Sequence, residues 1–459
     1  MNQQKCQRRE FLKFLGAATA TALTPKWLTG AVSSKKKPNV VIIFTDDQGT
    51  IDANCFGAHD LHTPNLDGLA QKGIRFTQFY VGAPVCSPSR AALMTGRYPQ
   101  RAQLDTNAPC QKGHAGMPTE QMTIAELLKS AGYTTGHVGK WHMGYTPETM
   151  PNGQGFDFTF GHMGGCIDNY SHFFYWEPPN LHDLWQNGKE VWRDGEFFGD
   201  LMVEKCQEFI EKNKNNPFFL YWAINMPHYP QQGQEKYRQM YKDYQEPRKS
   251  YAAFVSTLDE KIGKVVNTLD KLGLRENTLI IFLSDHGHSA EKRNNYGGSG
   301  GNAGPHRGHK FTLWEGGIRV PCIVSWPGRL PEGEVRGEKA ISLDWFPTIA
   351  HYCEVEMPDR KIDGLNISAL IESDKVLSPH EIMYWQLRKQ WCVRQGDWKL
   401  VVNGPGSEYK GKKIPPEKIF LSNLAEDQSE THNQAKKHPE IVEKFTKYHD
   451  AWFEEVFKQ

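Results

Sequence analysis

A cysteine precedes a predicted helix start in the stretch APVCSPSRAALMTG, in which it is Cys86. Ser87 is a favourable helix N-cap and Pro88 a favourable first helical residue, so we expect a helix that ends at Gly96. Backbone N–H groups and the helix dipole favour negative charge at such an N-terminus. Cys86 is therefore either a reactive thiol with a lowered pKa or an inert thiol ahead of a helix.

Polar side chains also follow four of the predicted strands. The strand at 40–44 is followed by Asp46 and Asp47, that at 133–138 by Lys140 and His142, that at 218–223 by His228, and that at 279–283 by Asp285 and His286. One such ending is common in ordinary turns. The carboxyl ends of strands in an open α/β sheet, however, gather at one edge, where ligands bind. We therefore expect these side chains to form one site.

Two kinds of chemistry are present in that set. Asp46, Asp47 and Asp285 are hard oxygen donors, which suit Ca²⁺ or Mg²⁺ better than zinc. The cationic and imidazole side chains suit an oxyanion such as sulfate or phosphate, and they are Arg90, Lys140, His142, His228 and Lys310. Soft sulfur is a poor ligand for a hard cation, so position 86 suits an oxygen nucleophile although the encoded residue is cysteine.

The hydrophobic pattern predicts the elements that position these residues. Between residues 38 and 365, apolar runs typical of buried strands alternate with amphipathic helices, which indicates an α/β fold. We expect a mainly parallel mixed sheet sandwiched by helices. Residues 366–459 contain short strands, a hairpin and a final amphipathic helix, which predict a smaller C-terminal α+β domain with an antiparallel sheet. The glycine-rich stretch GGSGGNAGPHRGHK is expected to be a rim loop that carries Lys310.

The first 34 residues are typical of an export signal and linker. Arg8 and Arg9 precede a short apolar run in CQRREFLKFLGAATATALTP, which resembles a twin-arginine signal. A plain secretory signal and a short membrane anchor are the alternatives, but the apolar run is too short to span a bilayer comfortably. The sequence therefore predicts a periplasmic or extracellular protein that meets the export machinery and has no stable membrane span.

The composition bounds the partners and the cysteine chemistry. The chain has 459 residues and a formal net charge of +1, which argues against a nucleic-acid partner. There are nine cysteines. Apart from Cys6 and Cys86 they show no zinc-type spacing, and an odd number remains, so at least one stays unpaired within the chain.

The residues from Cys86 to Arg90, followed by AALMTGR, resemble the signature of the type I, formylglycine-dependent sulfatases of the alkaline phosphatase superfamily. Six further segments are similar to sulfatase segments and occur in the family order: IIFTDDQG, GHVGKWHMG, PFFLYWAINMPHYP, LSDHG, HKFTLWEGGIRVP and DGLNI. The resemblance covers most of the mature chain. It implies an alkaline phosphatase-like fold and the hydrolysis of sulfate esters.

The resemblance also implies a role for each site residue. A separate maturation enzyme oxidises Cys86 to formylglycine, whose hydrate is an oxygen nucleophile. The implied ligands of the cation, usually calcium with Mg²⁺ as an alternative, are Asp46, Asp47, Asp285, His286 and the modified Cys86. Arg90 supports the hydrate, Lys140 and Lys310 bind sulfate oxygens, His228 protonates the leaving alcohol, and His142 is the base that releases sulfate. Position 286 is often asparagine in the family.

The sequence indicates the substrate less clearly than it indicates the catalytic residues. The stretch NYSHFFYWEPPNLHDLWQNGKEVW combines aromatic residues with His172 and His182, which could bind a sugar ring and its hydroxyls. Ordinary core or loop packing is the alternative. We hypothesise a carbohydrate sulfatase that acts on sulfated saccharides in polysaccharide degradation. The alternatives are a phosphonate monoester or phosphodiester hydrolase of the same superfamily and a protein that binds a sulfated glycan without turnover.

Overall fold

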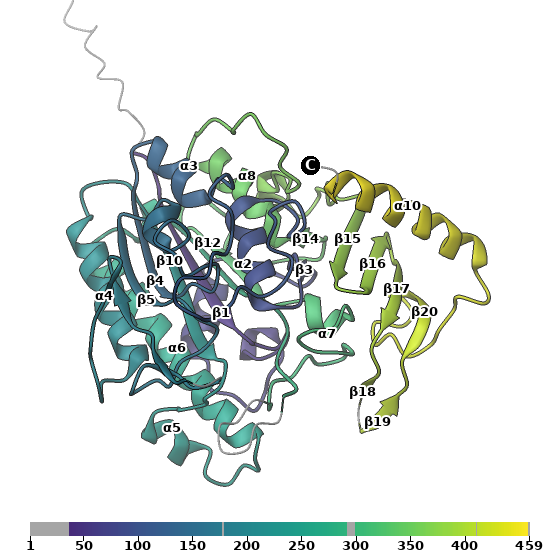
Figure 1. The fold of residues 1–459 in the computed structure, drawn as a ribbon, viewed down its shortest axis with the longest axis horizontal. Helices are drawn as coiled ribbons and strands as arrows, with labels where there is room; N and C mark the ends of the chain where they lie inside the picture. The colour runs from purple at the N-terminus through teal and green to yellow at the C-terminus, as the bar shows by residue number, and fades with distance from the viewer. Residues whose placement is uncertain (1–35, 177–178, 292–298, 410, 458–459) are drawn as a thin grey trace, which may run out of the picture. The chain divides into compact units, whose positions relative to one another are not determined.

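The computed structural model describes residues 36–176, 179–291, 299–409 and 411–457 (Figure 1). Residues Lys37–Gln459 form one compact unit. The predicted export signal lies outside the described residues. Within the described ranges, no helix is long and apolar enough to cross a membrane.

A ten-stranded mixed sheet forms the centre of the fold. In order across the sheet, its strands are β13 (Glu334–Arg336), β2 (Ile74–Phe76), β12 (Cys322–Ser325), β11 (Thr278–Ser284), β1 (Asn39–Asp46), β10 (Phe218–Pro227), β4 (Thr134–Lys140), β5 (Phe158–His162), β8 (Trp185–Gln186) and β9 (Lys189–Glu190). The five strands from β11 to β5 run parallel to one another, whereas β12, β8 and β9 pair antiparallel with their neighbours. The predicted α/β fold with a mainly parallel mixed sheet is confirmed.

Helices cover both faces of this sheet because its central strands are apolar on both sides. In β1, Val40, Ile42 and Phe44 belong to one hydrophobic cluster, and Val41 and Ile43 belong to the other. This alternation follows from the pleat of a strand, which turns successive side chains to opposite faces. The first cluster includes α2 (Cys86–Thr95), α3 (Ile124–Ser130) and α8 (Trp345–Tyr352), and the second includes α1 (Pro64–Gln71), α4 (Phe198–Lys212) and α6 (Arg248–Lys271) (Figure 1).

The C-terminal part contains an antiparallel sheet, as predicted. Its strands, in order, are β15 (Ile382–Leu387), β16 (Gln390–Gln395), β17 (Trp398–Gly404) and β20 (Glu417–Asn423), and α10 (Pro439–Phe457) packs against them (Figure 1). The Trp452 ring of α10 stacks on Tyr384, with ring centroids 5.3 Å apart, and meets Tyr98 of the main part edge-on. The two parts therefore share hydrophobic contacts across the predicted boundary at residue 365.

The remaining elements are short. The helices are α5 (Glu235–Met240), α7 (Glu315–Ile318) and α9 (Ser368–Glu372), and the two-stranded ribbons are β3 (Phe79–Tyr80) with β14 (Ala340–Ile341), β6 (Phe173–Phe174) with β7 (Leu181–His182), and β18 (Ser407–Tyr409) with β19 (Lys412–Ile414). The β6–β7 ribbon matters for the site, because Phe174 of β6 lines the cavity described below.

Candidate active site

Helix α2 places Cys86 at the carboxyl edge of the sheet. The helix begins at Cys86 itself, with Val85 as the N-cap, so the prediction that Ser87 caps the helix is wrong. The Ser87 hydroxyl instead accepts a hydrogen bond from the backbone N–H of Ala108, at 3.0 Å. The helix ends at Gly96 in the left-handed conformation, as predicted, with φ of 65°. Cys86 is 2% exposed and belongs to the first helical turn.

Three buried ion pairs surround position 86. They join Lys140 Nζ to Asp46 Oδ2 at 2.7 Å, Lys310 Nζ to Asp47 Oδ1 at 2.9 Å, and Arg90 Nη2 to Asp285 Oδ2 at 2.8 Å. The carboxylates come from the ends of β1 and β11, and Lys140 comes from the end of β4, so parallel strands bring them to one edge. Because buried charges are costly unless they are paired, this balance of three carboxylates and three cations explains how so many can be buried together.

The thiol of Cys86 lies beside cationic groups. Lys140 Nζ is 3.3 Å from its Sγ, and His286 Nε2 is 3.4 Å from it. Burial opposes ionisation of the thiol, but the ammonium groups of Lys140 and Lys310 outweigh burial and hold the pKa of Cys86 well below its usual value. The surroundings of position 86 therefore favour an anion.

The carboxylates fit a divalent cation. Oδ1 of Asp46 and Oδ2 of Asp47 are buried and accept no hydrogen bond. Donor atoms of Asp46, Cys86, Asp285 and His286 lie within 4.8 Å of one another, and a second group joins Asp46, Asp47 and His228. Burial raises the pKa of Asp47 to about 7, although Lys310 lowers it in part. Such unsatisfied, hard oxygen atoms are what Ca²⁺ or Mg²⁺ would coordinate.

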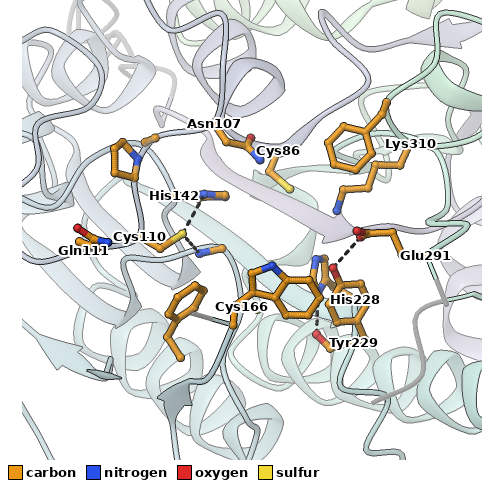
Figure 2. A pocket seen from close by; sticks show the side chains of 16 residues that line it. Cys86, Asn107, Cys110, Gln111, His142, Cys166, His228, Tyr229, Glu291 and Lys310 are labelled. Atoms are coloured by element: carbon orange, nitrogen blue, oxygen red, sulfur yellow. Dashed lines mark hydrogen bonds between the residues drawn. The ribbon is translucent and has the colours of Figure 1, made fainter. Parts of the chain in front are cut away.

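A cavity of about 440 Å³ opens over Cys86. Figure 2 shows Cys86, His142, His228 and Lys310 converging on it from different sides. The cavity is large enough for a small ligand that carries a sulfate-sized anion. The structure thus brings together all ten residues predicted for catalysis and cation binding: Asp46, Asp47, Cys86, Arg90, Lys140, His142, His228, Asp285, His286 and Lys310.

The pKa values of the two cavity histidines shift in opposite directions. Burial lowers the pKa of His228 to about 3, and the nearby Lys310 adds to this effect. Burial also disfavours the charged form of His142, but the adjacent Cys110 outweighs it and raises the pKa of His142. An acid at position 228 needs a raised pKa and a base at position 142 needs a lowered one. Both shifts are therefore opposite to those that the expected roles require. A bound anion near the His228 ring would raise its pKa.

Several lining residues were not singled out individually from the sequence, although Trp176 and Tyr229 lie in stretches quoted above. The Sγ of Cys110 is 3.5 Å from His142 Nε2, and Tyr229 donates a hydrogen bond to Glu291 at 2.6 Å. The Trp176 ring stacks on Tyr229 with ring centroids 5.2 Å apart. These residues lie on loops without a recognisable motif, although Tyr229 directly follows His228. Cys110 and the seven other described cysteines are free.

His172 and His182 do not line this cavity. Each ring instead contacts a glutamate residue of its own segment through one nitrogen. The interpretation of both as substrate-binding residues has no support in their position. From the same segment, Phe174 and Trp176 line the cavity wall.

Comparison with known proteins agrees with this arrangement. The sequence model of the family described as Sulfatase matches residues 38–355. Arylsulfatase A from Homo sapiens is 32% identical over 447 residues, which cover 88% of this chain and 85% of that protein. N-acetylgalactosamine-6-sulfatase from Homo sapiens is 33% identical over 415 residues, with coverage of 80% and 75%. The crystal structure of Ps i-CgsB in complex with k-i-k-neocarrahexaose has a TM-score of 0.80 at 32% identity and covers 91% of this chain and 93% of its own.

Proposed function

The chain belongs to the sulfatase family of sulfuric ester hydrolases, and we propose that it hydrolyses sulfate esters of carbohydrates in the site around Cys86. The observation that carries the proposal is the placement of Cys86 at a helix N-terminus between Lys140 and Lys310, at the base of the cavity. Anions are stabilised there by ammonium groups and by backbone N–H groups. Sulfate release from defined sulfated saccharides tests the proposal.

We propose that Cys86 is converted to formylglycine before the enzyme acts. This oxidation replaces the soft sulfur by oxygen, and the hydrated aldehyde offers the oxygen nucleophile that the position suits. Arg90, 2.8 Å from Asp285, holds the surrounding carboxylate in place. A divalent cation bound by the carboxylates and His286, most simply Ca²⁺, would add positive charge beside the nucleophile.

The remaining residues act on the sulfate group and on protons. Lys140 and Lys310 bind equatorial sulfate oxygens, where negative charge develops. His228 donates a proton to the ester oxygen, because a sugar alkoxide is a poor leaving group. His142 removes a proton from the second hydroxyl at position 86, which releases sulfate. Lys310 lowers the pKa of His228, and the negative charge of a bound substrate would raise it. Substrate binding would therefore favour the protonated ring that an acid requires.

A sulfated saccharide is the proposed substrate for two reasons. Two of the similar proteins are N-acetylgalactosamine-6-sulfatase and Ps i-CgsB, the latter solved with a saccharide. The cavity wall also combines the stacked rings of Trp176 and Tyr229 with polar groups of Asn107 and Gln111. Aromatic faces and hydrogen-bonding side chains are what a sugar ring and its hydroxyls require. An exported location remains a proposal that depends on residues 1–34.

Substitution His228→Ala is expected to slow hydrolysis of saccharide sulfates by about 100-fold, while activated aryl sulfates lose only a few-fold. The reason is that a phenolate departs without a proton, whereas a sugar alkoxide does not. Steady-state rates on one substrate of each kind measure the difference, with the exposed His114→Ala as the control. Equal losses on both substrates would show that His228 is not the leaving-group acid.

Substitution Trp176→Ala is expected to raise KM for saccharide sulfates by about 10-fold, with little change for a small aryl sulfate. The indole supplies an aromatic face to the sugar and does not touch the reacting sulfur. Phe453→Ala, which removes an exposed ring from α10, is the matched control. A change in kcat that is the same for both substrate classes would contradict this role.

The rival activities have separate tests. Comparing turnover of an aryl sulfate with that of an aryl phosphodiester distinguishes a sulfatase from a phosphonate monoester or phosphodiester hydrolase. A protein that only binds glycans would retain the unmodified thiol at position 86 and release no sulfate.

A further inference from the structure

We propose that His172, His182 and Asp194 form a second metal site, separate from the carboxylate cluster, that binds Zn²⁺. One ring nitrogen of each histidine and one carboxylate oxygen lie within 4.8 Å of one another. Both histidines are buried and Asp194 is exposed. Two imidazoles and a carboxylate are a known protein ligand set for zinc, in which water takes the fourth position.

The hydrogen bonds of the two rings leave one nitrogen on each free for a metal. His172 Nε2 is 3.1 Å from the backbone oxygen of Glu196, and His182 Nδ1 is 2.9 Å from Glu190 Oε1. Because only a protonated nitrogen can donate to these oxygens, the other nitrogen of each neutral ring carries a lone pair. Those nitrogens, His172 Nδ1 and His182 Nε2, are buried and have no hydrogen-bond partner in the part of the chain that the structure describes.

This pattern is the one that zinc-bound histidines show. A histidine ligand almost always donates its second ring N–H to a carboxylate or a backbone carbonyl, which fixes the tautomer and the ring orientation. Here one ring has a carbonyl partner and the other a carboxylate.

The third ligand is available and reachable. The side chain of Asp194 has no hydrogen bond or ion pair among the described residues, and it faces solvent. Ligand atoms around tetrahedral zinc are roughly 3.3 Å apart, given bonds of about 2.0–2.1 Å. The three side chains must therefore draw closer together to bind the metal, and rotation of the exposed Asp194 carboxylate supplies part of that movement. Its exposure also provides the entry path. Water would complete the coordination.

Ring stacking and backbone conformation fix the positions of the His172 and His182 side chains. Trp192 stacks on His182 with ring centroids 3.7 Å apart and an angle of 6° between planes. His182 pairs with Phe173 across the β6–β7 ribbon, and His172 directly precedes that strand with φ of 60°. In a regular strand, neighbouring side chains point to opposite faces, so this left-handed residue changes the direction in which the His172 side chain points.

A metal bound at this second site would stabilise one wall of the active-site cavity. Residues 172–194 contain the β6–β7 ribbon and carry Phe174 and Trp176 to the lining. A metal that joins His172, His182 and Asp194 would tie the two ends of this segment together. Nitrogen donors select zinc and related transition metals over calcium, so the site also differs chemically from the carboxylate cluster.

Cobalt binding tests the proposal. The full chain carrying Cys86→Ala, which removes the thiol of the other cluster, is stripped of metal and titrated with Co²⁺. Besides any Co²⁺ that the oxygen-rich carboxylate cluster takes up, we expect one equivalent to give the visible absorption of tetrahedral Co²⁺ without a thiolate charge-transfer band, and Zn²⁺ to displace it. Adding Asp194→Ala should weaken this binding at least 10-fold, and adding His182→Gln should abolish it, whereas the exposed His59→Gln should change nothing.

Because Asp194 is exposed, its substitution tests the site without disturbing the core. Circular dichroism of each variant confirms that it is folded. The proposal is overturned if the parent chain shows no tetrahedral Co²⁺, or if both variants bind it as tightly as the parent does.

Discussion

Replacing Cys86 by alanine is expected to lower the rate of sulfate release at least about 10⁴-fold, as removal of a catalytic nucleophile does. The fold should persist, because alanine is a better helix former than cysteine and the change deletes a single atom beyond Cβ in the first turn of α2. Sulfate release and thermal unfolding of the variant measure the two effects. Substrate binding should remain, since Lys140 and Lys310 are unchanged.

The matched control is Cys55→Ala, which removes a partly exposed thiol that does not line the active-site cavity. Its activity should equal that of the parent chain. The mass of the peptide that contains Cys86 gives the complementary result: conversion to formylglycine lowers it by about 18 Da, because one sulfur and two hydrogens are replaced by one oxygen. Activity retained in Cys86→Ala, or full activity with an unmodified thiol, would remove the basis of the proposed reaction.

The strand-end residues were predictable because parallel pairing determines where they meet. Once β1, β4 and β11 are recognised as buried strands, Asp46, Lys140 and Asp285 must lie at the same edge of the sheet. The pairing adds a detail that the sequence lacked. It matches each of the three carboxylates to one cationic side chain.

Loop residues and side-chain directions were not predictable in the same way. Ser87 has the residue type of a cap, but the hydroxyl bonds to the loop at Ala108 instead. His172 and His182 were grouped with the aromatic residues around them, yet neither is among the residues that line the cavity. Backbone conformation decides such cases: the left-handed φ of His172 has no signature in residue type. Cys110 reaches His142 only because two loops meet there.

A cation completes the electrostatics of the site. Arg90, Lys140 and Lys310 are each paired with one of three carboxylates, which offsets much of the positive charge that they offer to a sulfate ester and an ionised nucleophile. A divalent cation supplies two positive charges, which match one negative charge on each of these groups. The unpartnered oxygens of Asp46 and Asp47 are the natural places for it.

Removal of the bound cation is therefore expected to lower activity at least about 10³-fold, which corresponds to roughly 4 kcal/mol of lost transition-state stabilisation. Chelation followed by dialysis is the treatment, and addition of Ca²⁺ or Mg²⁺ should restore the rate.

The apparent cation affinity should fall as the pH drops below about 7, because the raised pKa of Asp47 lets a proton compete with the cation there. The substitution Asp47→Asn should weaken the affinity at every pH and flatten this dependence. Asp259→Asn, which alters a buried carboxylate between α1 and α6, should leave the affinity unchanged. A chain that keeps full activity with no cation detectable by elemental analysis would show that the carboxylates serve only to orient Lys140, Lys310 and Arg90.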